Sequence, residues 1–86
     1  MLIRKQAVAE KLAAYLRHQS TRQQLVNWAE NAMMEGEFAE ADMAALRAVV
    51  SRLGLADLRT FGLSWEDCEQ LLHELGYAAH VDVTPA

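Results

Sequence analysis

Two histidines and one carboxylate near the C-terminal end of the sequence have the chemistry of metal ligands. His73 falls in a helical pattern, and His80 and Asp82 lie two residues apart in an alternating segment, where they would share one face of a strand. Imidazole and carboxylate groups bind zinc and similar divalent cations, but a site needs at least three of them to converge. We expect no bound metal or other cofactor, and we keep a metal or small-molecule site at these three residues as an alternative.

The single cysteine, Cys68, has no partner for a disulfide within the chain. It lies near the start of a predicted helix, where the helix dipole would stabilise a nucleophilic thiolate. However, it falls on the apolar side of that helix, three residues before Leu71, and Glu66 and Asp67 beside it disfavour a thiolate. We therefore expect Cys68 to be a packed core residue. The sequence also has no Gly-rich phosphate loop and no Gly-x-Ser-x-Gly motif, so an enzyme is not expected.

Charge divides the sequence into a mildly basic part and a strongly acidic part. The whole chain carries a net charge of −4, with residues 1–36 at +2 and residues 37–86 at −6. An acidic protein lacks the phosphate-neutralising charge on which nucleic-acid binding depends, so no nucleic-acid partner is expected. The acidic part, with Glu66 and Glu69, is either ordinary solvated surface or a face for a basic protein.

The small size and acidity of the chain are similar to those of bacterial immunity proteins and antitoxins, which mask basic toxins. No sequence motif accompanies this similarity of composition. It implies a further alternative, in which the chain is an inhibitor of a basic protein.

Large side chains near the fourth predicted helix are candidates for an interface. Trp65 lies at the start of that helix, and Tyr77 follows its end. Tryptophan and tyrosine are enriched at protein interfaces. The expected interface contains these two residues, the two glutamates Glu66 and Glu69, and the apolar positions of the final alternating segment, namely Ala79, Val81 and Val83.

Four helices, predicted from apolar residues that recur every three or four positions, would position these groups. The first covers residues 3–18. The second begins after a capping box at residues 20–23 and ends at a left-handed Gly36, and the short loop before it predicts an antiparallel hairpin. The third ends at Gly54, and the fourth begins with a capping box at residues 64–67 and ends at Gly76. The apolar stripes are, in chain order, Val8, Leu12, Tyr15 and Leu16; Leu25, Trp28, Ala29 and Ala32; Met43, Leu46, Val50 and Leu53; and Cys68, Leu71, Leu72 and Leu75.

Residues 77–84 alternate between apolar and polar types, which predicts a strand, and a strand needs a partner for its backbone groups. Three solutions remain open. Residues 57–62, which fit a strand or a helical turn, would pair with it inside the chain, or the same segment of a second copy would pair with it antiparallel. In the third solution, the segment is an extended arm over the helices.

The expected fold is therefore mainly α: residues 1–86 form a single small four-helix domain, a helical hairpin plus two further helices, with a C-terminal β-strand or extended arm. No apolar run approaches the ~20 residues that cross a bilayer, and the start lacks a secretory pattern, so no membrane partner and a cytoplasmic location are expected. The expected function is protein association: a homodimer formed through the C-terminal segment, with an acidic face for a basic protein.

Overall fold

Four α-helices and a two-stranded sheet make up the computed structural model, which describes residues 2–58, 61–79, 83 and 85. This confirms the prediction of a mainly α, four-helix fold. The elements in chain order are β1 (Leu2–Ile3), α1 (Lys5–Leu16), α2 (Arg22–Glu35), β2 (Glu37–Phe38), the 3₁₀ turn η1 (Glu40–Asp42), α3 (Met43–Gly54) and α4 (Trp65–Glu74).

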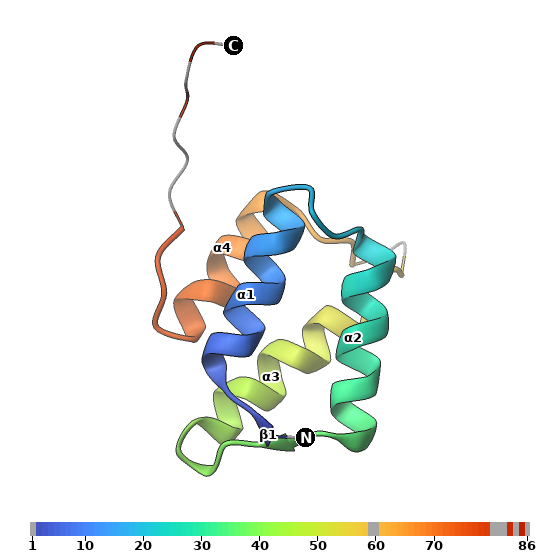
Figure 1. Cartoon of the computed structure of the whole chain (residues 1–86), viewed down its shortest axis with the longest axis vertical. Helices are drawn as coiled ribbons and strands as arrows, with labels where there is room; N and C mark the ends of the chain where they lie inside the picture. Colours follow the sequence, from blue (N-terminus) through green and yellow to red (C-terminus); the bar gives the residue numbers. More distant parts are fainter. Residues whose placement is uncertain (1, 59–60, 80–82, 84, 86) are drawn as a thin grey trace.

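The helices form two neighbouring pairs. Figure 1 shows α1 running upward and α2 running back downward, which is the antiparallel arrangement predicted for the hairpin. α3 crosses obliquely and packs mainly on α2, whereas α4 lies beside α1. Both pairs bury their apolar sides in one shared core, to which every helix and β1 contribute. The buried cluster consists of Ile3, Val8, Ala9, Leu12, Leu25, Ala29, Ala32, Leu46, Val49, Val50, Leu53, Cys68, Leu71, Leu72 and Leu75.

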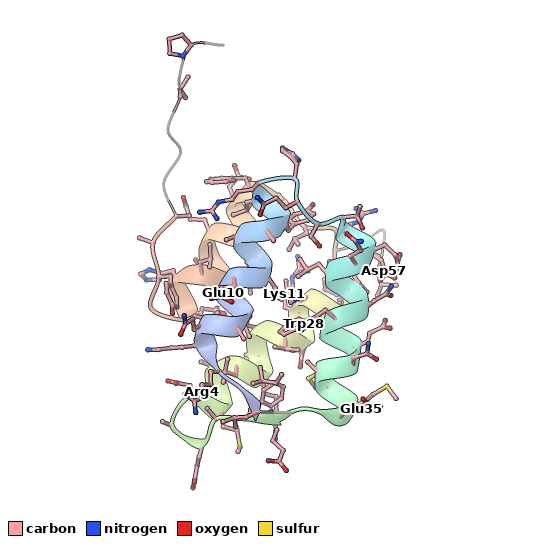
Figure 2. All side chains as sticks on the ribbon, in the orientation of Figure 1. Arg4, Glu10, Lys11, Trp28, Glu35 and Asp57 are labelled. Carbon is pink, nitrogen blue, oxygen red and sulfur yellow. The ribbon has the colours of Figure 1, made fainter. Side chains whose placement is uncertain are left out.

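The predicted stripes agree with this core except at their margins. Trp28 is half-buried, and the Lys11 ammonium lies 5.7 Å from the centre of its ring. Figure 2 shows these two side chains between α1 and α2. Met43 was expected in the core but is 39 % exposed, because it is the first residue of α3.

α1 is shorter than residues 3–18 at both ends, because Ile3 belongs to β1 and a backbone turn stops the helix after Leu16. The His18 N–H donates to the Tyr15 carbonyl at 3.1 Å, and the Gln19 N–H donates to the Ala14 carbonyl at 2.8 Å. This pair of bonds closes a helix when the residue after the C-cap is left-handed, a conformation that usually selects glycine. His18 has a φ of 61°, so a histidine takes that position here.

Capping boxes begin α2 and α4. The prediction at residues 64–67 is confirmed: the Ser64 hydroxyl accepts the Asp67 N–H at 3.1 Å, and the Asp67 carboxylate accepts the Ser64 N–H at 3.0 Å. The prediction at residues 20–23 was wrong by one residue. Thr21 is the N-cap of α2, and it exchanges the corresponding bonds with Gln24. The sequence does not distinguish these two registers, because Ser20 is followed by Thr21 and Gln23 by Gln24, so either pair fits a capping box.

The three glycines expected to end helices behave differently. Gly76 has a φ of +87° and closes α4: its N–H donates to the His73 carbonyl, and the Tyr77 N–H donates to the Leu72 carbonyl. Gly36 is the C-cap at which α2 ends, as predicted, but the left-handed conformation predicted for it was wrong, because its φ is −84°. The predicted end of the third helix at Gly54 is confirmed, although Gly54 has no left-handed φ. Gly54 is the last helical residue of α3, and Leu55 is the C-cap in a right-handed conformation.

A short parallel sheet closes the base of the fold, where β1 pairs with β2 in the register Leu2 to Glu37 and Ile3 to Phe38. The Ala39 N–H also donates to the Ile3 carbonyl at 2.9 Å. The sequence analysis predicts no strand at residues 37 and 38. Two-residue strands are too short to show the alternation from which strands are predicted.

The expected C-terminal strand is not formed where the structure describes it. Tyr77–Ala79 have no regular structure, and Val83 is 91 % exposed, while residues 80–82 and 84 lie outside the described part of the chain. The described residues of 57–62 are turn or irregular, so the strand alternative for that segment was wrong there. Within residues 2–58 and 61–79, no helix combines the length and the apolar character needed to cross a bilayer.

Gly36 and Gly54 give a matched test of the packing at the base of the fold. A Cβ atom on Gly36 would lie 2.6 Å from the Ala32 carbonyl oxygen and 2.8 Å from Ile3 Cγ1, whereas one on Gly54 would meet nothing within 4 Å. We expect Gly36→Ala to lower the free energy of unfolding by about 1–3 kcal/mol. Gly54→Ala should raise it by about 0.5–1 kcal/mol. Urea denaturation measures both; equal effects of the two substitutions would contradict the close contact at Gly36.

Candidate functional site

A groove of about 650 Å³ with a mainly apolar lining runs between α1 and α4. α1 and its C-cap form one wall, and α4 with residues 77–79 forms the other. We call this surface the α1–α4 face. Its lining residues are Gln6, Ala9, Glu10, Ala13, Leu16, Arg17, Trp65, Leu72, Tyr77, Ala78 and Ala79.

The α1 wall is built from residues spaced three and four apart. Gln6, Ala9, Ala13 and Leu16 therefore form one stripe along the helix. Because the two alanines carry only a methyl group, they leave a depression in the middle of this wall. Glu10 and Arg17 are exposed along the same wall. Figure 2 shows Lys11 on the side of α1 toward Trp28, with Glu10 on a different side.

The opposite wall carries two large aromatic side chains, which the ends of α4 place there. Trp65 follows the N-cap Ser64, and Tyr77 follows the left-handed Gly76. Trp65 is 36 % exposed and Tyr77 is 37 % exposed, while Leu72 lies buried between them along the helix. Both ends of this wall are therefore aromatic and accessible to a partner.

An acidic hollow lies on the other side of residues 77–79. It is lined by Glu66, Glu69, Gln70 and His73 of α4, together with Tyr77, Ala78 and Ala79. Its lining residues include two exposed glutamates and no lysine or arginine. Residues 77–79 thus separate an apolar groove from an acidic flank.

The structure brings together five of the seven residues predicted as interface candidates. Trp65, Tyr77 and Ala79 line the groove, and Glu66 and Glu69 line the acidic hollow. The other two candidates are not part of this surface as described. Val83 lines neither hollow, and Val81 lies outside the described residues.

The candidate metal ligands are only partly described. His73 is exposed and shares the acidic hollow with Glu69, whereas His80 and Asp82 lie outside the described residues. Among the residues that the structure describes, no group of three or more His, Cys, Asp and Glu side chains is arranged to hold a metal ion. The described side chains around His73 therefore supply no metal site by themselves.

An ion pair from α3 fixes the start of α4. Arg52 Nη2 lies 3.3 Å from Asp67 Oδ2, and Arg52 Nη1 donates to the Gly62 carbonyl at 3.1 Å. The pKa of Asp67 is lowered from its ordinary value, chiefly by hydrogen bonds from the Ser64 backbone and hydroxyl and further by the charge of Arg52. Asp67 is thus held in the charged form that both the capping box and the ion pair require.

Cys68 is buried in the core, as its position on the apolar stripe predicted. Burial raises the pKa of its thiol to about 11, and the neighbouring Asp67 charge adds to that increase. The thiol is therefore protonated at neutral pH and shielded from solvent. Both properties oppose a nucleophilic role for this residue.

Sequence reasoning missed the α1 wall of the groove. Ala9, Ala13 and Leu16 were assigned to no surface, and Glu10 and Arg17 were counted only as charges. One signal was present: the small residues of α1 recur at helical spacing beside its main apolar stripe. That signal does not reveal which element lies opposite, because the contact between α1 and α4 joins segments about 60 residues apart in the sequence.

Comparisons with known proteins provide no relative. A scan against protein-family models finds no match. A search of curated proteins finds no similar sequence. A search of solved structures finds no match. The site is therefore interpreted from its own geometry.

The buried thiol of Cys68 gives a direct readout of folding. At pH 8 a thiol with a pKa of about 11 is ionised in only about one molecule in a thousand. We expect an aromatic disulfide reagent to label Cys68 very slowly in the folded protein and rapidly in guanidinium. Because the pKa is raised from 9.0 on folding, stability should also fall as the pH rises from about 9 to about 11. Labelling of the folded protein as fast as of a free thiol would contradict this placement.

Proposed function

We propose that this chain is a protein-association domain that forms a homodimer through the α1–α4 face. The observation that carries the proposal is the gathering of Trp65, Tyr77 and Ala79 along one apolar groove. These residues come from both ends of α4 and from the segment beyond it, and α1 provides the opposite wall. Association here replaces the pairing of C-terminal strands expected from the sequence, because Tyr77–Ala79 form no strand in the described structure.

The composition of the groove supports binding of a protein surface. Tryptophan and tyrosine supply a large contact area for little loss of conformational freedom, and they dominate the binding energy of many interfaces. The alanines of α1 let a partner's backbone approach closely. Leu16 and Leu72 add apolar area to the two walls of the groove. Burying such a surface in an oligomer removes apolar area from water, which stabilises association.

The charges on α1 favour a second copy as the partner. Glu10 and Arg17 place both signs of charge on the same wall of the groove. In a two-fold dimer each patch meets an identical patch, so the interface must be complementary to itself. A surface that carries one charge of each sign satisfies that condition, whereas a surface of one sign repels its own copy.

Removing the aromatic side chains tests this interface. We expect Trp65→Ala and Tyr77→Ala each to weaken dimerisation by about tenfold or more, because each removes a large accessible side chain from the groove. Sedimentation equilibrium over a concentration series measures the dissociation constant. Met34→Ala is the matched control, since Met34 is 81 % exposed on α2 and does not line the groove.

Two results would count against the proposal. One is a wild-type chain that remains monomeric at several hundred micromolar. The other is a dimer whose dissociation constant is unchanged in both aromatic variants. Circular dichroism of each variant establishes that it is folded, so that loss of association is not a consequence of unfolding.

A second candidate function is supported by the acidic flank. Glu66 and Glu69 are exposed one turn apart on α4, and no lysine or arginine lines the hollow they share. Such a patch attracts a cationic surface at long range. The partner would be a basic protein, and the inhibitor role suggested by the small, acidic composition would use the same flank.

Charge neutralisation tests the acidic flank separately from the groove. We expect a labelled lysine-rich peptide to bind the wild-type chain, and Glu66→Gln combined with Glu69→Gln to weaken that binding several-fold. Binding should also weaken as salt is added, because exposed charges are screened. Fluorescence anisotropy measures both effects. The control is Glu30→Gln combined with Glu35→Gln, which removes the same charge from α2 and should bind the peptide as the wild type does. Equal losses of peptide affinity in the two double variants would contradict a specific role of the acidic flank, because only the net charge of the chain would then matter.

A further inference from the structure

The stripe of α1 that lines the groove has the spacing of a helix-pairing surface. Gln6, Ala9, Ala13 and Leu16 follow one another at intervals of three, four and three residues, which is the repeat by which two helices pack together. Glu10 and Arg17 border this stripe and lie seven residues apart. Seven residues correspond to about two helical turns, or about 10.5 Å along the axis. The two charges therefore stand on one side of α1.

A two-fold axis acting on this stripe pairs the charges. If two copies of α1 run antiparallel and cross beside Ala13, Glu10 of each copy lies at the height of Arg17 in the other. A parallel pair related by a two-fold axis would instead place the charges of the two copies on opposite sides of the dimer, because both charges border the stripe on the same side of α1. Of the two arrangements, only the antiparallel one brings opposite charges together across the interface.

The side-chain sizes fit the same arrangement. In an antiparallel pair crossing beside Ala13, Leu16 of one copy lies at a height between residues 9 and 13 of the other. Both of those residues are alanine, so they leave a hole for the larger side chain. Alanine at the crossing point also permits the shortest axis separations seen between packed helices, about 8 Å.

We propose that two copies of this chain associate by packing α1 against α1 in antiparallel orientation, with Glu10 of each copy paired with the partner's Arg17 across a two-fold axis beside Ala13. This inference rests on the proposed homodimer and specifies its geometry. Trp65 and Tyr77 then border the partner's α1 on the side of α4, because they form the opposite wall of the groove that this helix enters.

A charge swap tests the pairing. We expect Glu10→Arg and Arg17→Glu each to weaken dimerisation by about tenfold or more, because each creates two like-charge contacts in one dimer. The double variant Glu10→Arg/Arg17→Glu should restore the dissociation constant to within about threefold of the wild-type value, since it reverses both members of each pair. Glu30→Arg and Arg47→Glu are matched controls, because both residues are exposed, on α2 and α3, and neither lines the groove.

A cysteine at the crossing point tests the geometry without changing any charge. Two Ala13→Cys side chains would face each other at the axis, within reach of a disulfide. Cys68 is buried and should not react. We expect mild oxidation to convert the Ala13→Cys variant to a covalent dimer on a non-reducing gel. Asn31→Cys, on the exposed side of α2, should remain monomeric on the same gel.

The outcomes separate this geometry from the proposed function. A wild-type chain that does not dimerise overturns both. A wild-type dimer whose affinity is unaffected by the single charge reversals, or is not restored by the swap, overturns the antiparallel α1 pairing and leaves the homodimer standing. Failure of the Ala13→Cys variant to cross-link, in a chain that still dimerises, would likewise overturn the antiparallel α1 pairing and leave the homodimer standing. Thermal unfolding of each variant confirms that the subunit itself is folded.

Discussion

The burial of α4 on the core is the constraint on which the rest of this surface depends. α4 has only ten residues, and an isolated helix of that length is marginal in water. Its buried residues, Cys68, Leu71 and Leu72, supply the packing that holds it in place. Because Trp65 is the first residue of this helix and Tyr77 follows its end, the groove exists only while α4 is docked beside α1. The stability of the core and the shape of the site therefore have the same physical origin.

Arg52 helps to fix the position of α4 on the core. Its guanidinium lies beside the Asp67 carboxylate, donates to the Gly62 carbonyl, and has its centre 5.4 Å from that of the Phe61 ring. A partly exposed ion pair contributes little to stability. Its three contacts nevertheless connect the end of α3, the following loop and the first turn of α4. The lowered pKa of Asp67 favours the charged carboxylate on which this connection depends.

The accuracy of sequence reasoning depended on how far a pattern extends along the chain. Helices of ten residues or more repeat their apolar spacing several times, so all four were predicted with most of their core residues. β1 and β2 have two residues each and show no period, and they form only because Ile3 joins the core and pairs with Phe38. Gly36 was assigned a left-handed role, but its actual requirement is close contact with Ile3. The site was predicted on its α4 side alone, since helical periodicity does not specify which helices become neighbours.

The uneven charge of the chain adds a reason for association to involve α1 instead of the acidic surface. Two copies with a net charge of −4 repel each other, and most of that charge lies in residues 37–86. α1 belongs to the part of the chain with net charge +2, so contact through α1 brings the least repulsive surfaces together. Glu66 and Glu69, across residues 77–79 from the groove, then remain in solvent. A dimer formed through α1 would therefore leave both acidic flanks exposed, and each could attract a basic partner while the subunits stay paired.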